Sequence, residues 1–276
     1  MRISRRKFSQ FAISGAAALT FGLQEPAYSS TKKGFDFGPN RLDWYPARTN
    51  DSKAPVIIYV HGGAWALGNR GQVGSKPRYF TRRGYHFVSV SYTLFPAANV
   101  ETQALQIATA INWVHANATR LNADPNRIAL MGHSAGCHLS SLATLTGGAP
   151  PVKAIVCNDT RAYDLKYLAS ISGGRLPLLY ASPFRRRKMW PAWSPISYTG
   201  LQKQPPVLVA WSNGRNRDKI SKRFADALEF DGVEVHRYDG SNQYNHVTID
   251  RAMGSENGRL TQSVDRFFEN VLSRSA

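Results

Sequence analysis

Residues 128–136 read Ile-Ala-Leu-Met-Gly-His-Ser-Ala-Gly, and this arrangement is more informative than any other part of the chain. The first four residues form a short apolar run typical of a buried strand, and the residues after Gly136 favour a helix. A Gly-x-Ser-x-Gly pattern between a strand and a helix predicts a sharp turn that exposes the hydroxyl of Ser134. We therefore predict Ser134 as a nucleophile, with the Ala135 N–H at the helix N-terminus donating to a developing oxyanion.

Short apolar runs alternate with helical patterns along most of the chain. Segments of strand length, rich in β-branched and aromatic residues, are 56–60, 87–91, 127–131, 153–157, 207–211 and 233–238. Helices are predicted over 101–118, 135–146, 218–231 and 258–272. This alternation predicts a three-layer α/β sandwich with a mostly parallel central sheet. The exception is 160–200, rich in proline and aromatic residues, which we predict to be a small cap insertion.

A second motif, His61-Gly62-Gly63-Ala64-Trp65, directly follows the predicted strand 56–60. Two consecutive glycines leave their backbone N–H groups unobstructed, so these groups can donate to an oxyanion that forms only during the reaction. We predict Gly62 and Gly63 as oxyanion-hole donors, together with Ala135.

With these motifs, the chain resembles the α/β-hydrolase superfamily, and within it the esterase group that includes hormone-sensitive-lipase-like and kynurenine-formamidase-like carboxylesterases. The resemblance runs from about Leu42 to the C-terminus and implies a single α/β-hydrolase domain over residues 30–276. Thr93 and Gln106 stand where similar proteins carry an arginine and an aspartate, so we expect an ion pair to be absent. The other motifs that carry the resemblance, in the expected order, are Ser91-Tyr92, Pro96, Trp113-Val114, Asp124 to Ile128, Ser194-Pro195 and Asn245-His246.

The general base must be one of seven histidines. His246 alone lies in a loop after the last predicted strand, where the resembling proteins place their base and where the order Ser, acid, His requires it. We therefore predict His246 as the base. The other six lie in the two motifs, in predicted helices or along predicted strands: His61, His86, His115, His133, His138 and His236.

The acid that orients the imidazole is harder to assign. The resembling proteins carry it in the turn after the strand at 207–211, but here the first carboxylate in that region is Asp218. We predict Asp218 as the acid. Two alternatives stay open: Asn213 as a neutral acceptor, and Asp159, which follows the preceding strand and would act from the other side of the site.

Composition fits a globular enzyme, with 42% hydrophobic and 19% charged residues among 276. The formal charge of +17 includes the run Arg185–Lys188, which is either a solvated loop or a rim attracting anionic substrates. No nucleic-acid-binding motif accompanies this charge, so we expect no nucleic-acid partner.

Cys137 and Cys157 are too few for a disulfide scaffold, although a bond between the two stays open. No metal-ligand spacing or phosphate-binding loop is present, and we expect no cofactor.

Residues 1–29 resemble a twin-arginine export signal. They contain a basic start with Arg5-Arg6, a weakly apolar run from Phe11 to Leu23, and small residues up to Ser29. The run is shorter and more polar than the roughly 20 apolar residues that a membrane span needs. We expect a periplasmic or secreted protein whose mature chain has no transmembrane segment.

The sequence therefore predicts an exported serine hydrolase that cleaves a small-molecule carboxylic ester, anionic or neutral, through an acyl-enzyme. An arylformamidase or amidase would use the same machinery and stays an alternative. The displaced acid also leaves open a relative that lost catalysis and only binds a ligand.

Overall fold

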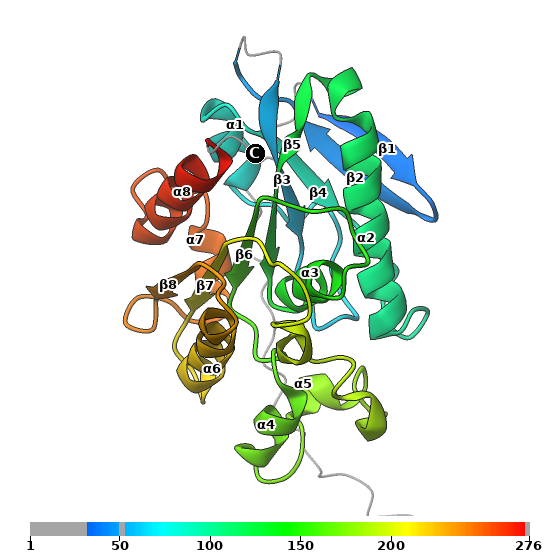
Figure 1. Ribbon diagram of the computed structural model, residues 1–276, viewed down its shortest axis with the longest axis vertical. Coiled ribbons are helices and arrows are strands. Elements are labelled where there is room, and N and C mark those ends of the chain that lie inside the picture. Colours follow the sequence, from blue (N-terminus) through cyan, green and yellow to red (C-terminus); the bar gives the residue numbers. More distant parts are fainter. Residues whose placement is uncertain (1–31, 50–52, 274–276) are drawn as a thin grey trace, which may run out of the picture.

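The computed structural model describes residues 32–49 and 53–273 (Figure 1). The expected export signal, residues 1–29, lies outside the described residues.

Eight strands form one sheet in the order β1-β2-β4-β3-β5-β6-β7-β8. From β4 to β8 every neighbouring pair is parallel, whereas β2 runs antiparallel to both β1 and β4. The predicted, mostly parallel sheet is confirmed. The strands are β1 (Lys33–Phe37), β2 (Asn40–Tyr45), β3 (Ala54–Val60), β4 (His86–Val90), β5 (Ala123–His133), β6 (Ala154–Asn158), β7 (Val207–Trp211) and β8 (Val235–Asp239).

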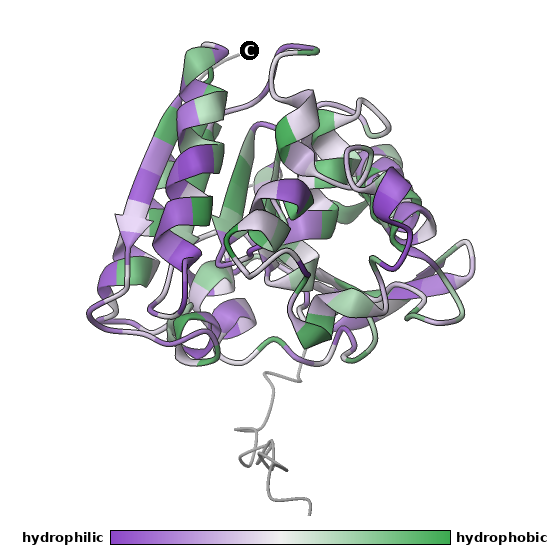
Figure 2. Ribbon diagram, turned by 90° about the horizontal axis from the view of Figure 1, so that it is seen from below, coloured by the Kyte–Doolittle hydropathy of each residue, from purple (hydrophilic) through white to green (hydrophobic). Residues whose placement is uncertain are grey.

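Helices cover both faces of this sheet, which gives three layers. Side chains alternate along β3: Ile58 packs in the cluster formed with α2, α3 and α6, and Tyr59 packs in the cluster formed with α1, α7 and α8. Figure 2 shows hydrophobic residues along the central strands and hydrophilic residues on outer helix faces. The helices are α1 (Lys76–Arg82), α2 (Val100–Asn117), α3 (Ala135–Leu145), α4 (Leu165–Ser170), α5 (Leu178–Ala181), α6 (Arg217–Phe230), α7 (Thr248–Ala252) and α8 (Arg259–Leu272).

All six predicted strands and all four predicted helices are present, with ends shifted by a few residues. Strands β1 and β2 were not predicted. β1 lies at the sheet edge with most of its residues exposed, so it needs no continuous apolar run. The short helices α1 and α7 are also missing from the prediction, because so few turns produce little helical periodicity.

The segment between β6 and β7 forms the small cap, with α4, α5 and two single 3₁₀ turns beyond the carboxyl ends of the strands (Figure 1). Its aromatic side chains pack inward on Trp65 of the 61–65 motif. The ring centroids of Phe184 and Tyr180 lie 4.6 and 5.3 Å from that of Trp65. The cap therefore rests directly on the loop that was predicted to stabilise an oxyanion. No helix in the described part of the chain is long and apolar enough to cross a membrane.

Candidate active site

Ser134 occupies a strained turn between β5 and α3. Its backbone has φ 54° and ψ −117°, a conformation that non-glycine residues rarely adopt. A side chain on Gly132 would collide with the backbone of Gly136, and one on Gly136 would overlap the carbonyl oxygen of Val60. Both glycines are thus required by contact between backbones. The turn places the Ser134 hydroxyl at the N-terminus of α3, where backbone N–H groups favour negative charge.

The 61–65 motif lies directly beside this turn. A Cβ atom on Gly62 would be 3.1 Å from the Cβ atom of Ser134, so the two backbones are in close contact. Gly63 has φ 124°, and a side chain there would overlap the carbonyl oxygen of Leu67. The imidazole of His61 donates from Nδ1 to the Gly62 carbonyl oxygen at 2.7 Å. The structure therefore places Gly62 against Ser134, while Ala135 directly follows Ser134 as the first residue of α3.

His246 lies in the loop between β8 and α7 and reaches the Ser134 hydroxyl. Its Nε2 atom is 3.0 Å from Ser134 Oγ. Two hydrogen bonds hold this loop in place. His133 Nε2 donates to the His246 carbonyl oxygen at 2.9 Å. The Oδ1 atom of Asn245 accepts from the Thr248 N–H at the start of α7. The predicted nucleophile and base are thus within hydrogen-bond distance.

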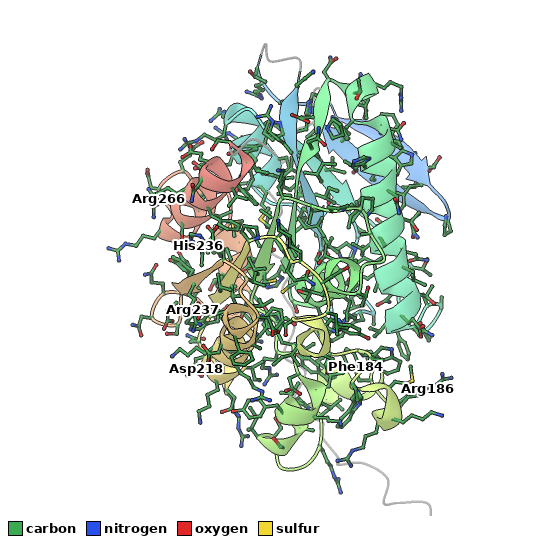
Figure 3. The ribbon with its side chains drawn as sticks, viewed as in Figure 1. Phe184, Arg186, Asp218, His236, Arg237 and Arg266 are labelled. Carbon is green, nitrogen blue, oxygen red and sulfur yellow. The ribbon has the colours of Figure 1, made fainter. Side chains whose placement is uncertain are left out.

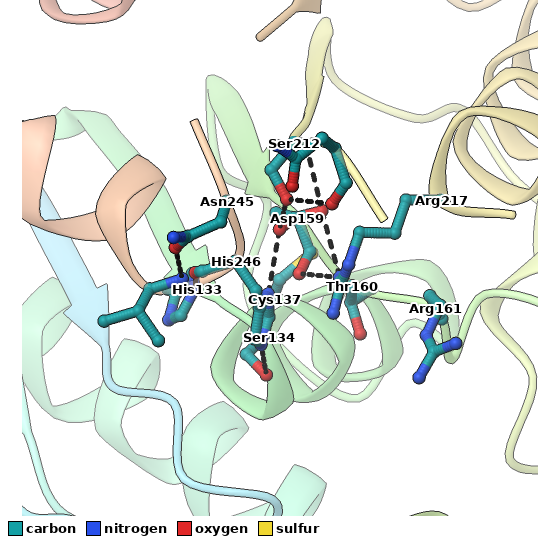
Figure 4. A network of polar contacts seen from close by, with 12 residues as sticks. His133, Ser134, Cys137, Asp159, Thr160, Arg161, Ser212, Arg217, Asn245 and His246 are labelled. Carbon is teal, nitrogen blue, oxygen red and sulfur yellow. Dashed lines mark hydrogen bonds and ion pairs between the residues drawn. The ribbon is translucent and has the colours of Figure 1, made fainter. Parts of the chain in front are cut away.

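The carboxylate that contacts the imidazole belongs to Asp159. Nδ1 of His246 donates to Asp159 Oδ2 at 2.8 Å, so Ser134, His246 and Asp159 form one continuous chain (Figure 4). Asp159 follows β6, and its left-handed backbone, φ 59°, turns the side chain toward β7. The expectation for Asp218 is corrected here, in favour of an alternative that the sequence had left open.

Asp218 is displaced because α6 presents a different residue to the site. It lies partly exposed in the first turn of α6, as Figure 3 shows, while the preceding residue, Arg217, points inward to Asp159. The second alternative, Asn213, is exposed, and its backbone N–H donates to the Tyr244 carbonyl oxygen. A helix turns by about 100° per residue, so adjacent positions face different surroundings.

The Asp159 carboxylate is fully buried and accepts hydrogen bonds on both oxygens. Ser212 donates its hydroxyl at 2.5 Å and its backbone N–H at 3.3 Å, and Arg217 Nη1 lies at 3.1 Å. Burial would raise the pKa of Asp159, but the hydrogen bond from His246 and the charge of Arg217 outweigh it and hold the pKa below its usual value. Ser212 and Arg217 are functional candidates that the sequence reasoning missed. Ser212 lies at the start of the turn in which the resembling proteins carry their acid. In this chain it donates a hydrogen bond to Asp159 instead.

The family model described as BD-FAE matches residues 42–220, well over half of the chain. The chain belongs to the BD-FAE family. This match includes Ser134 and Asp159 and ends before His246.

Several similar proteins and structures are described as esterases. Esterase LipQ of Mycobacterium tuberculosis is 29% identical over 90% of the chain and 64% of its own length, and an isoprenylcysteine α-carbonyl methylesterase of Arabidopsis thaliana is 31% identical over 49% and 31%. The chain thus spans only part of these relatives. Thermogutta terrifontis esterase 2 phosphonylated by sarin shares the fold with a TM-score of 0.74 and 18% identity, covering 93% of the chain and 100% of its own. Esterase B of Lactobacillus rhamnosis has a TM-score of 0.71 at 18% identity, covering 84% and 81%.

Three histidines of the BD-FAE domain, of which His61 and His138 are fully buried, support the site in neutral form. Burial lowers the pKa of His61, His133 and His138 to about 4 each. His138 joins the oxyanion loop to the cap: its Nδ1 accepts from Trp65 Nε1 at 3.1 Å, and its Nε2 donates to the Trp193 carbonyl oxygen at 2.7 Å. A charged imidazole could not accept the first of these bonds.

A buried ion pair anchors the helix that follows His246. Lys76, with a side chain only 1% exposed, contacts Asp250 of α7 at 3.0 Å, and the Tyr59 hydroxyl donates to the same carboxylate at 3.0 Å. Burial would raise the pKa of Asp250, but the Lys76 charge outweighs it and lowers that pKa. The position of the His246 loop thus depends on contacts with α1 and β3.

Where the resembling proteins carry an ion pair, this chain has two uncharged side chains, Thr93 and Gln106, that form hydrogen bonds with each other. The Thr93 N–H donates to Gln106 Oε1 at 2.8 Å, and Gln106 Nε2 donates to the Thr93 hydroxyl at 3.0 Å. Two hydrogen bonds therefore replace the expected ion pair, and they connect the loop after β4 to α2.

The cysteines and the basic run lie outside this network of contacts to Ser134. Cys137 and Cys157 are buried free thiols, and Cys137 Sγ is 3.3 Å from the Tyr163 hydroxyl. The side chains of Arg185–Lys188 are exposed on the cap, where Figure 3 shows Arg186 at its outer edge. Within residues 32–49 and 53–273, no group of three or more His, Cys, Asp or Glu side chains is arranged to hold a metal ion.

Proposed function

We propose that this chain is a serine hydrolase that cleaves carboxylic esters of small molecules through an acyl-enzyme. The observation that carries the proposal is the unbroken chain from Ser134 Oγ to His246 Nε2, at 3.0 Å, and from His246 Nδ1 to Asp159 Oδ2, at 2.8 Å. This is the geometry of a nucleophile with its base, and of a base with the acid that orients it. It also removes the reason for a purely ligand-binding role, which was the absence of an acid beside His246.

The proposed reaction has two steps. Ser134 Oγ bonds to the ester carbonyl carbon while its proton passes to His246 Nε2, and the carbonyl oxygen becomes an oxyanion facing the N–H groups of Gly62, Gly63 and Ala135. The ester C–O bond then breaks, and His246 returns the proton to the departing alcohol. Water repeats the sequence on the acyl-enzyme, releasing the acid and restoring the serine.

The names of the relatives support ester cleavage over amide or formamide cleavage. LipQ, which covers most of the chain, is described as an esterase, and the similar Arabidopsis protein as a methylesterase. The structural neighbour from Thermogutta terrifontis is phosphonylated by sarin, a covalent reaction that fits a reactive nucleophile. The arylformamidase alternative would use the same residues and differ only in the pocket.

We also propose export of the chain through its first 29 residues and a preference for anionic esters. The Arg5-Arg6 pair and the apolar run after it support export. The net charge of +17 supports attraction of anions. Replacing both arginines by lysine and following the protein in periplasmic and cytoplasmic fractions tests the first part.

The test of the reaction is release of nitrophenol from 4-nitrophenyl acetate and butyrate by residues 30–276, beside Ser134→Ala. We expect turnover to fall by at least about 10⁴-fold in the variant, because loss of the nucleophile removes the covalent route. Folding of the variant is checked by thermal unfolding. Equal rates for the two proteins would overturn the serine mechanism, and faster cleavage of N-formylanilines than of esters would favour the arylformamidase.

A further inference from the structure

Arg161 is a half-buried cation near the site that the machinery described above does not use. It lies two residues after Asp159 in the loop that follows β6. Among the described residues, no carboxylate lies within ion-pair distance of its guanidinium group, whereas Arg217 is paired with Asp159 at 3.1 Å. Its Nε atom is buried without a hydrogen-bond partner, and Nη1 makes one long contact of 3.4 Å with the Arg215 carbonyl oxygen. A guanidinium group has five N–H donors, so most of its capacity is unused.

The surroundings of Arg161 connect it to the oxyanion loop. Its Cζ atom lies 5.4 Å from the ring centroid of Tyr180, and that ring lies 5.3 Å from Trp65. Trp65 ends the motif whose Gly62 touches Ser134. Figure 4 shows Arg161 beyond Thr160, with its guanidinium group directed away from Asp159 and Arg217. The free donors thus lie between the cap and the loop after β7, beside the catalytic chain and separate from it.

We propose that Arg161 binds a carboxylate group carried by the ester substrate, so that the enzyme prefers singly charged half-esters to neutral esters of the same size. The inference rests on the proposed function and names its substrate class. A carboxylate can accept two parallel hydrogen bonds from one guanidinium group, which fills donors that the protein leaves open. The exposed Arg215, whose carbonyl oxygen contacts Arg161, adds a second positive charge to this part of the chain.

The test compares Arg161→Met with wild type on two pairs of esters, and the two members of each pair differ only by one carboxylate group. One pair places the charge on the acyl group: 4-nitrophenyl hydrogen glutarate against 4-nitrophenyl butyrate. The other places it on the alcohol: 4-carboxyphenyl butyrate against phenyl butyrate. Because hydrogen bonds between charged groups are stronger than those between neutral groups, we expect kcat/KM for the charged member of at least one pair to fall about 10- to 100-fold. The neutral members are expected to change less than about 2-fold, which also reports correct folding.

Two further variants separate contact from general charge. Arg161→Lys keeps the charge but loses the two-bond geometry, so we expect an intermediate loss. Arg186→Met removes an exposed arginine from the cap and is expected to leave both pairs within about 2-fold. Losses in Arg161→Met that are equal for charged and neutral members, or absent from both pairs, would overturn the proposal, because Arg161 would then only pack against Tyr180.

A binding measurement keeps this inference separable from the reaction. We expect monomethyl glutarate to bind Ser134→Ala saturably in a calorimetric titration, and the binding to disappear in Ser134→Ala with Arg161→Met. Such binding without any ester cleavage by the wild type would refute the proposed function and retain the anion site. Ester cleavage without Arg161-dependent binding or charge preference would refute the anion site and retain the proposed function.

Discussion

The two turns that meet at His246 are held by different forces. On the nucleophile side, Ser134 and the 61–65 motif are fixed by contacts between backbones and by neutral histidines. On the acid side, Asp159 is fixed by hydrogen bonds and charge from Ser212 and Arg217, more than 50 residues away in the chain. The first kind of constraint also joins distant segments, such as Trp65 and His138, 73 residues apart, but it requires particular residues at particular positions. The second kind of constraint needs only hydrogen-bond donors near the carboxylate at the ends of the strands, and different segments of the chain can supply them.

The largest effect is expected from removing the charge of Asp159. Asp159→Asn leaves His246 without a carboxylate to orient its ring and stabilise its cation, and this change costs about 10⁴ in kcat in a serine protease triad. We expect a loss of similar size for hydrolysis of 4-nitrophenyl butyrate. Asp218→Asn is the matched control, and we expect its kcat to stay within about 2-fold of wild type, since surface changes have small effects.

The opposite result for these two variants would contradict the assignment of Asp159 as the acid. A large loss in Asp218→Asn, with Asp159→Asn nearly unaffected, would return the acid to the start of α6. Unfolding midpoints of both variants are measured beside the rates, because Asp159 also carries the buried contact with Arg217 at 3.1 Å.

The same difference explains what could be predicted from the sequence. Runs such as 207–211 identified the strands of the parallel core, because a strand buried on both faces must be apolar throughout. The neighbours of Ser134 and Gly62 identified the nucleophile turn, because glycine is required wherever backbones touch. Asp159 could not be singled out, because its role depends on β6 lying beside β7 and on the direction in which α6 presents Arg217.

An intermediate effect is expected from crowding the oxyanion loop. In Gly63→Ala the new methyl group would overlap the Leu67 carbonyl oxygen at a backbone φ of 124°, so the loop must change its conformation beside Ser134. Loss of one oxyanion donor costs about 10²–10³ in kcat, and we expect a fall in that range. Gly74→Ala is the control, because Gly74 also has positive φ, 55°, but has no atom near enough to touch an added methyl group.

The contrast between these glycines tests whether contact or backbone strain dominates. We expect Gly74→Ala to lower the unfolding free energy by about 1 kcal/mol through strain alone and to leave kcat unchanged. Equal losses of kcat in the two variants would mean that positive φ, rather than the approach of Leu67, sets the loop geometry.

The last effect concerns pH, and it distinguishes the two sides of His246. The folded-state pKa of His138 is lowered from 6.5 to about 4 by burial, so below pH 6.5 the unfolded chain binds a proton that the folded chain does not. The unfolding free energy therefore falls on acidification by up to about 1.4 kcal/mol per pH unit for each such histidine, between pH 6.5 and 4. His61 and His133 behave alike. Asp159, with its lowered pKa, loses its contribution only as the pH falls below the usual carboxyl value of 3.8.

Acidification should accordingly loosen the nucleophile side first, and His138→Gln tests this. The glutamine amide can accept from Trp65 Nε1 and donate to the Trp193 carbonyl oxygen, as the imidazole does, but it does not titrate. Urea unfolding at pH 7, 6 and 5 is expected to show a pH slope reduced by about 1.4 kcal/mol per unit near pH 5, whatever the stability at pH 7. An unchanged slope would mean that His138 takes up its proton at the same pH in the folded and unfolded chains. Burial would then not keep it neutral, and the histidines would not distinguish the nucleophile side from the acid side.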